Sequence, residues 1–482
     1  MSLPGVTVKD RESAVASSPP LDTATSFVVG LAERGPVGTA VKCRSRAQFE
    51  SVYGGEVSYG YLWDAANVIP KEGGGDIYFS RVVGPAAKAS TVKLSDGSGN
   101  TLQVDAASPG AWGDDIDVKV TVPGGGNFVL AVIYKGATVE TSPPLANNAE
   151  AVLWAEHSEY VRLKDLGGSD PAAAEAALTG GTDDRGNITD TERKAALAAL
   201  TRDLGAGQVA YPGGTSTAIH TALLEHAEDY NRCAILDATD TATVATLTGE
   251  AATLRALGTS ARCGGLFAPW AVVKGSAVGT TKTVPYSLIQ MGIIARHDGL
   301  TYDAAAGVTN PNDPAAGVNG VSLTTISLSQ PAWTEVNRET LNDAGVNVAR
   351  VVYGQVRTYG YRTLVNPLTD GLHLWLNNRR IDMAILAKAA LIGEEFVFAE
   401  VDGRGQVLGT FAGALRGEIL APYYQVGALF GATPEDAFWV DVGDAVNPPE
   451  QLAEGIFRAV IAARRSPLAE QVEIEYVKEE VA

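Results

Sequence analysis

Two stretches in which strand-like runs alternate with helical segments are separated by a stretch of short alternating strands. SFVVGLA at 26–32 is typical of a buried strand, two helical segments follow it, and DIYFSRVVG at 76–84 is the next strand. The alternation resumes after Gly180, with strand runs CAILDA at 233–238 and CGGLFAPWAVV at 263–273. Because strands that alternate with helices are joined by right-handed crossovers, this pattern predicts a mostly parallel sheet.

Helix boundaries in these stretches carry recognisable signals. Ser45 stands three residues before Gln48, and Thr189 stands three residues before Glu192. In such a capping box the two side chains satisfy backbone N–H groups that the first helical turn leaves free. We therefore expect helices to begin at both places, and we expect Pro70 and the glycines at 73–75 to end a short helix between them.

The intervening stretch, residues 86–184, has a different sequence pattern. Its runs alternate apolar and polar residues between turns rich in Gly, Ser and Asn. In the third run, Ile116, Val118, Val120 and Val122 fall on one face and polar residues fall on the other. The pattern predicts an all-β module inserted into the α/β unit.

The last part of the chain mixes strand runs with a long helix from Arg380 to about Glu395, which predicts an α+β domain. The strand runs are NVARVVY at 347–353, LHLWLNN at 372–378, AFWVDV at 437–442 and GIFRAVIAA at 455–463. We therefore expect an N-terminal arm at 1–24, an α/β domain formed by 25–85 and 185–344, the inserted β-rich module at 86–184 and a C-terminal domain at 345–482.

The N-terminal end carries a short strand pattern held away from the body. Val6 and Val8 alternate with Thr7 and Lys9, and a polar stretch rich in Ser, Ala and Pro follows at 11–22. Ordering a lone strand costs about 1–2 kcal/mol per residue in backbone entropy, whereas each net hydrogen bond returns only about 1 kcal/mol. We therefore expect the segment to become ordered by adding to a sheet edge in another chain. The expected donated residues are Gly5, Val6, Thr7 and Val8.

The C-terminal end offers a matching strand. Val472, Ile474 and Tyr476 alternate with Glu473 and Glu475. The two acids disfavour indiscriminate edge pairing, and the apolar residues are expected to take part in pairing between subunits. The alternative that both ends pair within one chain stays open.

Composition excludes several classes of partner. The 37 Lys and Arg residues against 56 Asp and Glu residues give a net charge of -19, so the average surface repels a nucleic-acid backbone. Cys43, Cys233 and Cys263 form no CxxC pair or disulfide framework, which indicates a reducing cytoplasm. No signal-peptide pattern is present, and no apolar run reaches the roughly 18 residues of a membrane span. Neither signal-peptide export nor direct membrane insertion is expected.

The sequence contains no recognisable catalytic, cofactor or metal motif. The glycine-rich turns at 73–75, 123–126 and 180–186 lack the spacing of a phosphate loop, and neither HExxH nor GxSxG occurs. His220 and His226 lie six residues apart, about 600° round a helix, so they are interpreted as solvated helix surface. We expect no catalytic residue, no cofactor, no metal ligand and no enzymatic activity.

Several segments, in order along most of the chain, resemble the sheath proteins of contractile phage tails and related contractile injection systems. They are PGVTV, SFVVGLAERGPVGTAVKCRSRAQFESVYGG, GGGDIYFSRVVG, SPGAWGDDIDVKV, LTGGTDDRG, NNRRIDMAILAKA, GALFGATPEDAFWVDV and NPPEQLAEGIFRAVIAARRSPLAEQVEIEY. One region departs from the family's pattern. In TVPYSLIQMGIIARHDGLTYDAAAGVTNP, residues such as Pro285, Ser287, Arg296 and Asp298 keep the frame, but the loop at 301–313 differs.

The resemblance implies a multi-domain tail sheath architecture with an inserted all-β outer domain and extended N- and C-terminal linker arms. Sheath subunits polymerise around an inner tube, and on a baseplate signal the sheath contracts and drives the tube through a target cell envelope. Terminal arms link subunits by adding strands to a small sheet in neighbouring C-terminal domains. The implied partners are further copies of the chain, the inner tube protein, and baseplate and tail terminator proteins. The implied location is the tail of a virion assembled in the host bacterial cytoplasm, where contraction serves genome ejection.

Five arginines form a basic concentration in this acidic chain: Arg379, Arg380, Arg458, Arg464 and Arg465. Our hypothesis is that some of them contact an acidic tube surface or a neighbouring subunit. The alternative, a solvated face or ion pairs within the chain, stays open.

Two other classes of protein remain as alternatives. Another self-assembling surface or capsid protein accounts for the β module and the missing catalytic motifs, but not for arms at both ends. An α/β nucleotide-dependent enzyme requires a phosphate loop at the carboxyl end of a strand, and no such motif is present.

Overall fold

The computed structural model describes residues 23–124, 126–330, 332–401 and 404–470. Its largest element is an eight-stranded sheet with the order β18-β17-β13-β12-β11-β1-β3-β2. The six strands from β17 to β3 run parallel to their neighbours, and the two edge strands are antiparallel, which confirms the predicted mostly parallel sheet. The bounds are β1 (Ser26–Gly30), β2 (Val41–Cys43), β3 (Ile77–Arg81), β11 (Gln208–Ala210), β12 (Cys233–Asp237), β13 (Gly264–Ala268), β17 (Val346–Val352) and β18 (Gln355–Thr358).

Helices cover both faces of this sheet. Every residue of β1 is buried, with Val28 in the hydrophobic cluster on one face and Phe27 and Val29 in the cluster on the other. The first cluster includes residues of α1 (Arg46–Tyr53), α2 (Leu62–Glu72) and α7 (Tyr286–Leu300). The second includes residues of α4 (Asp190–Ala198), α5 (Thr217–Asp229), α6 (Val244–Arg255) and α8 (Glu335–Asp343). The all-apolar strand runs of the sequence are therefore explained by burial on both faces.

The helix starts follow the capping signals, with one difference. Thr189 and Glu192 form a complete capping box at the start of α4. At α1, the hydroxyl of Ser45 accepts from the Gln48 backbone N–H, but the Gln48 side chain accepts from the N–H of Arg44, one residue earlier than predicted. The prediction that Pro70 and the glycines end α2 is confirmed for the glycines, since Gly73 caps the helix in the left-handed conformation, but Pro70 lies inside the helix, which continues to Glu72.

The run at 263–273 forms two strands instead of the single predicted one. Pro269 carries no backbone N–H and breaks the run after β13. The following residues form β14 (Ala271–Lys274), which pairs with β15 (Thr281–Val284) and β16 (Thr325–Leu328) in a separate three-stranded sheet. A continuous apolar pattern does not show such a change of sheet.

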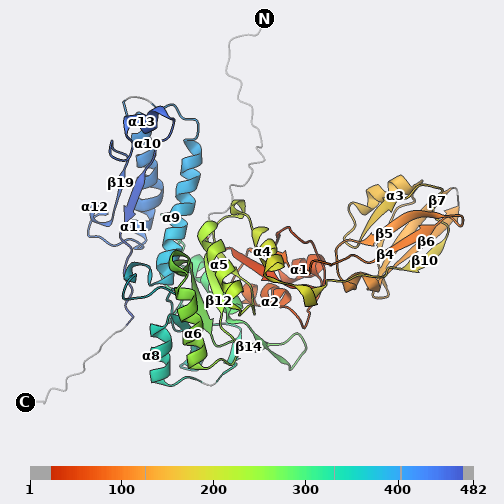
Figure 1. Ribbon diagram of the computed structural model, residues 1–482, viewed down its shortest axis with the longest axis horizontal. Helices are drawn as coiled ribbons and strands as arrows, with labels where there is room; N and C mark the ends of the chain where they lie inside the picture. The colour runs from red at the N-terminus through yellow and green to blue at the C-terminus, as the bar shows by residue number, and fades with distance from the viewer. Residues whose placement is uncertain (1–22, 125, 331, 402–403, 471–482) are drawn as a thin grey trace, which may run out of the picture.

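The stretch after β3 forms a β-rich unit that projects from the α/β body (Figure 1). It contains two sheets and a hydrophobic cluster of its own. As predicted, Ile116, Val118 and Val120 are buried, whereas Val122 is half exposed near the hairpin tip. The unit also holds a helix, α3 (Asn148–Ala155), so the description all-β is corrected to β-rich. Its strands are β4 (Thr91–Ser95), β5 (Asn100–Ala106), β6 (Ile116–Gly124), β7 (Asn127–Tyr134), β8 (Ala137–Thr141), β9 (Val161–Asp165) and β10 (Ala174–Ala177).

Charged side chains fix this β-rich unit to the body. Arg81 at the end of β3 is buried and donates to carbonyl oxygens on both sides of the junction, including those of Gly35 and Pro109. Glu33 accepts from Lys135 at 2.7 Å and from the hydroxyl of Tyr134 at 3.1 Å. The unit is thus held by directional bonds in addition to its chain connections.

The C-terminal unit lies on the opposite side of the body from the β-rich unit (Figure 1). Its helices surround a fourth hydrophobic cluster and a two-stranded sheet, β19 (Phe438–Asp441) with β20 (Val460–Ala463). The helices are α9 (Leu376–Glu395), α10 (Gln406–Ala414), a π-helical turn (Leu415–Leu420), α11 (Ala421–Gln425), α12 (Pro434–Ala437) and α13 (Pro449–Ala453). In the parts of the chain that the structure describes, no helix is long and apolar enough to cross a membrane.

Two predictions for this part are corrected. The boundary predicted at residue 345 cuts the main sheet, because β17 and β18 extend that sheet to Thr358. The run LHLWLNN is not a strand: Gly371–His373 form a 3-10 turn and α9 begins at Leu376, four residues before the predicted start. Alternating apolar residues at a helix start resemble a strand over so short a distance.

Candidate functional site

The sheet of β19 and β20 has an outer edge on β20 that can accept another strand. The two strands are antiparallel, with Phe438 opposite Ala463 and Val440 opposite Ile461. The N–H of Arg464 donates to the carbonyl of Ala437 at 2.8 Å. Because hydrogen-bonding residues alternate along such a strand, the N–H groups of Ile461 and Ala463 point away from β19.

The other edge of this sheet is occupied. Arg416, in the π-helical turn, donates from Nη2 to the carbonyl of Val440 on β19 at 2.8 Å. A charged side chain placed on an edge carbonyl blocks the approach of a further strand. Among the described residues no strand pairs with the outer edge of β20, so this edge is the one available for strand addition.

A cleft of about 430 Å³ lies beside that edge. Ile461 and Ala463 line it from β20, and Arg379 and Asp382 line it from α9. Arg465, also in its lining, donates to Asp382 at 2.6 Å. The cleft therefore places the charged side chains of Arg379, Asp382 and Arg465 beside β20.

The five predicted arginines differ in what they contact. Arg379 lines the cleft but donates to the carbonyls of Ala227 and Arg232 at 2.9 Å, and Arg465 pairs with Asp382. Arg458 and Arg464 are exposed. Arg465 thus forms an ion pair within the chain and Arg379 is held by backbone carbonyls, while contact of Arg458 and Arg464 with a partner stays a prediction beside the solvated-face alternative.

For Arg380, the hypothesis of a contact with the tube or a neighbouring subunit is wrong. Its side chain is fully buried and pairs with Asp298 of α7, whose side chain is 1% exposed. The hydroxyl of Thr23 donates to the same carboxylate at 2.7 Å. This arginine therefore joins α9, α7 and the first described residue of the chain, and it cannot reach a partner surface.

The predicted strand-donating residues lie outside the described residues. This applies to Gly5, Val6, Thr7 and Val8 at one end and to Val472, Ile474 and Tyr476 at the other. Their pairing stays a prediction.

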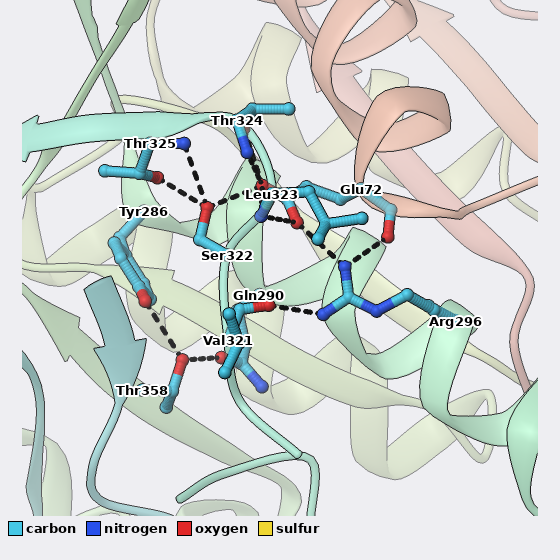
Figure 2. A network of polar contacts seen from close by, with 10 residues as sticks. All are labelled: Glu72, Tyr286, Gln290, Arg296, Val321, Ser322, Leu323, Thr324, Thr325 and Thr358. Carbon is cyan, nitrogen blue, oxygen red and sulfur yellow. Dashed lines mark hydrogen bonds and ion pairs between the residues drawn. The ribbon is translucent and has the colours of Figure 1, made fainter. Parts of the chain in front are cut away.

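A buried polar network in the body centres on an acid, as a catalytic site could (Figure 2). Glu72 ends α2 and is fully buried. Its carboxylate accepts from the hydroxyls of Ser322 and Thr324 at 2.6 Å, from the N–H of Leu323 at 2.9 Å and from Arg296 at 3.1 Å. These bonds fasten the loop before β16 to α2 and α7, and they leave the acid no access to a substrate.

At the carboxyl ends of parallel strands, where α/β enzymes bind ligands, the acid of β12 is paired within the protein. Asp237 ends β12, and burial raises its pKa to about 6. Its carboxylate accepts from the N–H and hydroxyl of Ser287, both at 2.7 Å, and from the N–H of Gly213 at 3.2 Å. The glycine turn before α5 therefore gives a donor to a protein carboxylate, which is a structural arrangement.

The two histidines of α5 are buried, so their interpretation as solvated surface is wrong. His220 Nε2 lies 3.0 Å from the carbonyl of Asp237, and His226 Nε2 lies 2.7 Å from Nη1 of Arg232. Arg232 is itself fully buried. Among the residues that the structure describes, no cluster of three or more His, Cys, Asp and Glu side chains is placed to hold a metal ion. Nothing local in the sequence shows that α5 packs between other helices.

Replacing His226 with glutamine is expected to reduce the loss of stability in acid. Burial, with a smaller contribution from Arg232, lowers the pKa of His226 to about 3. Below about pH 6.5, His226 binds a proton in the unfolded chain but stays unprotonated in the folded chain. The free energy of unfolding therefore falls as the pH decreases from that value. Between pH 7 and pH 5 we expect the variant to lose about 2 kcal/mol less than the wild type in urea denaturation. A glutamine at the exposed His157 serves as the control, and an identical pH dependence in the His226 variant would contradict the argument.

Solved structures with a similar fold include tail sheath proteins. The sheath tail protein of Listeria innocua matches with a TM-score of 0.61 at 14% identity, over 87% of this chain and 89% of that one. The sheath tail protein of Desulfitobacterium hafniense matches with a TM-score of 0.59 at 15% identity, over 91% and 93%. The helical sheath protein of the anti-feeding prophage, in its contracted state, matches with a TM-score of 0.56 at 16% identity, over 99% and 100%. No family model matches the chain, and no curated protein matches its sequence. The resemblance seen in the sequence is confirmed in the fold: this chain has the fold of tail sheath proteins.

Proposed function

We propose that this chain is the structural subunit of a contractile tail sheath. The observation that carries the proposal is the free outer edge of β20, on a sheet whose other edge is occupied by Arg416. A chain with an unpaired strand edge in the described part of its C-terminal unit and a strand pattern at each end has the elements needed for pairing between subunits. The fold likeness over nearly the whole length supports the same function, since one of the matching proteins forms a helical sheath.

In the proposed assembly, terminal segments of one subunit add to the β20 edge of another. The alternating residues of the N-terminal segment, including Val6 and Val8, and those of the C-terminal segment, including Ile474 and Tyr476, are the candidates for donation. Strand addition pairs backbone groups that are otherwise solvated and gives the apolar side chains a surface to cover. The polar stretch at 11–22 acts as a tether that lets subunits rotate without separating.

The remaining parts of the molecule have assigned places in this proposal. The C-terminal unit faces an inner tube protein, with the exposed Arg458 and Arg464 as candidate contacts to the tube or to a neighbouring subunit. The β-rich unit lies on the opposite side of the body (Figure 1), which supports its proposed place on the outside of the sheath. Baseplate and tail terminator proteins bind the two ends of the assembled sheath. The particle is a virion tail, or a related injection system, assembled in the bacterial cytoplasm, and the subunit has no enzymatic role.

Deleting Ser2 to Lys9 is expected to abolish assembly of the purified chain. The wild type should sediment as large particles, whereas the deletion variant should sediment as a monomer near 50.1 kDa, because the donated strand is missing. A control in which Val6 and Val8 are both isoleucine keeps the apolar face and should assemble. Equal assembly of the deletion variant in sedimentation velocity would contradict the donation of this strand.

A further inference from the structure

The last described residues cross from the C-terminal unit to the α/β body. The N–H of Ser466 donates to the carbonyl of Ala428 at 3.0 Å, and its hydroxyl donates to the carbonyl of Gly427 at 2.8 Å. Four residues later, Glu470 lies against the body, where it contacts Arg362 and Asn342. One short stretch thus joins the accepting strand β20 to the start of the C-terminal segment.

The contact at Glu470 is a two-pronged ion pair. Arg362 donates from Nε to Oε1 at 3.1 Å and from Nη2 to Oε2 at 2.7 Å. The side-chain amide of Asn342, on α8, donates to Oε1 at 3.0 Å. A fork of parallel charge-assisted bonds fixes direction as well as distance, which a single lysine contact does not.

Arg362 is held in place before it meets Glu470. Its backbone N–H donates to Asn347 Oδ1 at 2.7 Å, and Asn347 Nδ2 donates back to its carbonyl at 2.8 Å. Asn347 lies on β17 and is fully buried. Nη1 of the arginine donates to the carbonyl of Asn342 at 3.0 Å, and only 11% of its side chain is exposed. The guanidinium is therefore oriented by the main sheet and by α8.

We propose that Arg362, with Asn342, forms a clamp that holds the start of the C-terminal segment at Glu470. The clamp prevents tension on that segment from reaching the β20 edge. The inference rests on the proposed function, in which residues after Glu470 pair with a neighbouring subunit. Without the clamp, a pull at Glu470 passes to Ser466 and then opens the bonds between β20 and β19 one at a time. With the clamp, the parallel bonds at Glu470 share the pull before it reaches the strand. Arg362 is a positioning residue, acting through Glu470 on β20.

The first test measures the clamp in the isolated chain, below the concentration at which it assembles. A glutamate-specific protease cleaves after Glu470 only when that carboxylate leaves Arg362, so the cleavage rate reports how often the clamp opens. We expect Arg362→Lys to accelerate this cleavage about tenfold, because it keeps the charge and loses the fork. Asn342→Ala, which leaves the buried arginine in place, should accelerate it by a smaller factor.

The matched control for this test is Arg338→Lys. Arg338 lies on α8 and lines a groove together with Arg362 and Glu470, but its side chain donates to the carbonyl of Trp333. Cleavage after Glu470 should proceed in this control as in the wild type. An unchanged rate in both Arg362→Lys and Asn342→Ala would overturn the clamp.

The second test measures the isolation of β20 in assembled particles. Amide hydrogen exchange is followed at Val460, Ala462 and Arg464, whose N–H groups face β19. We expect Arg362→Lys to accelerate their exchange about tenfold in particles and to leave it unchanged in the isolated chain, since only an assembled neighbour pulls on the segment. A purely structural role would move both measurements, and either that result or equal exchange in both kinds of particle would overturn the isolation. If the wild type forms no particles, the proposed function fails, while the cleavage test still decides on the clamp.

Discussion

Replacing Arg380 with alanine is expected to lower the free energy of unfolding by about 3–5 kcal/mol. The arginine on α9 and Asp298 on α7 are buried together. Burial alone lowers the pKa of Arg380, yet the attraction of Asp298 raises it above its ordinary value. Removing the guanidinium leaves a buried carboxylate without this positive partner. The same carboxylate accepts from Thr23, so the variant should also loosen the start of the described chain.

Two further variants make this prediction specific. Arg416→Ala removes an exposed arginine from the same C-terminal unit, and we expect it to cost less than about 1 kcal/mol. Arg380→Met combined with Asp298→Asn removes both charges, and we expect it to recover more than half of the stability that the single variant loses. Equilibrium urea denaturation measures all three. A loss below about 1 kcal/mol for Arg380→Ala would show that the pair does not hold α9 against α7.

Placing proline at Ile461 is expected to prevent assembly. The N–H of Ile461 points away from β19, so proline removes a donor that an added strand needs and leaves the bonds to β19. It also places a ring where the incoming backbone must approach. We expect the concentration required for assembly to rise at least tenfold, because the same defect recurs at every contact in the particle.

The conservative variant Ile461→Val serves as the control for this edge. It keeps the N–H and a branched apolar side chain, so assembly should proceed as in the wild type. Thermal unfolding of both variants, monitored by circular dichroism, shows whether the β19–β20 pair survives. Assembly is measured by light scattering. Normal assembly of a folded Ile461→Pro variant would show that β20 is not the strand that accepts the donated segment.

The body of the fold follows closely from local sequence signals. The β1 run is apolar at every position that packs against helices on two faces, and the Thr189 capping box fixes the start of α4. These features depend on neighbouring residues in the chain, so the sequence alone shows them. The prediction of a single strand at 263–273 was wrong for the opposite reason. The change of sheet after Pro269 depends on which distant strands are available for pairing.

The candidate site was harder to predict from the sequence than the body of the fold, because it depends more on tertiary contacts. The sequence identified β19 and β20 as strands, but not the position of Arg416 on the β19 edge, because nothing between Arg416 and Val440 indicates that they meet. Arg380 belonged to a basic concentration in the sequence, yet its partner Asp298 lies 82 residues away and the pair is buried. His226 was assigned to solvent because its spacing of six residues from His220 places the two side chains on different faces of a helix. For Arg380 and Arg416 a contact with a residue far along the chain decided the role of the side chain, and for His226 its burial in the fold did.

Negative-stain electron microscopy of the purified wild-type chain tests the central claim most directly. A sheath subunit that links to its neighbours through the β20 edge should form long hollow cylinders, and the Ile461→Pro variant should yield isolated particles under the same conditions. A wild-type chain that stays monomeric at high concentration, without cylinders or rings, would contradict the proposal that it is a sheath subunit.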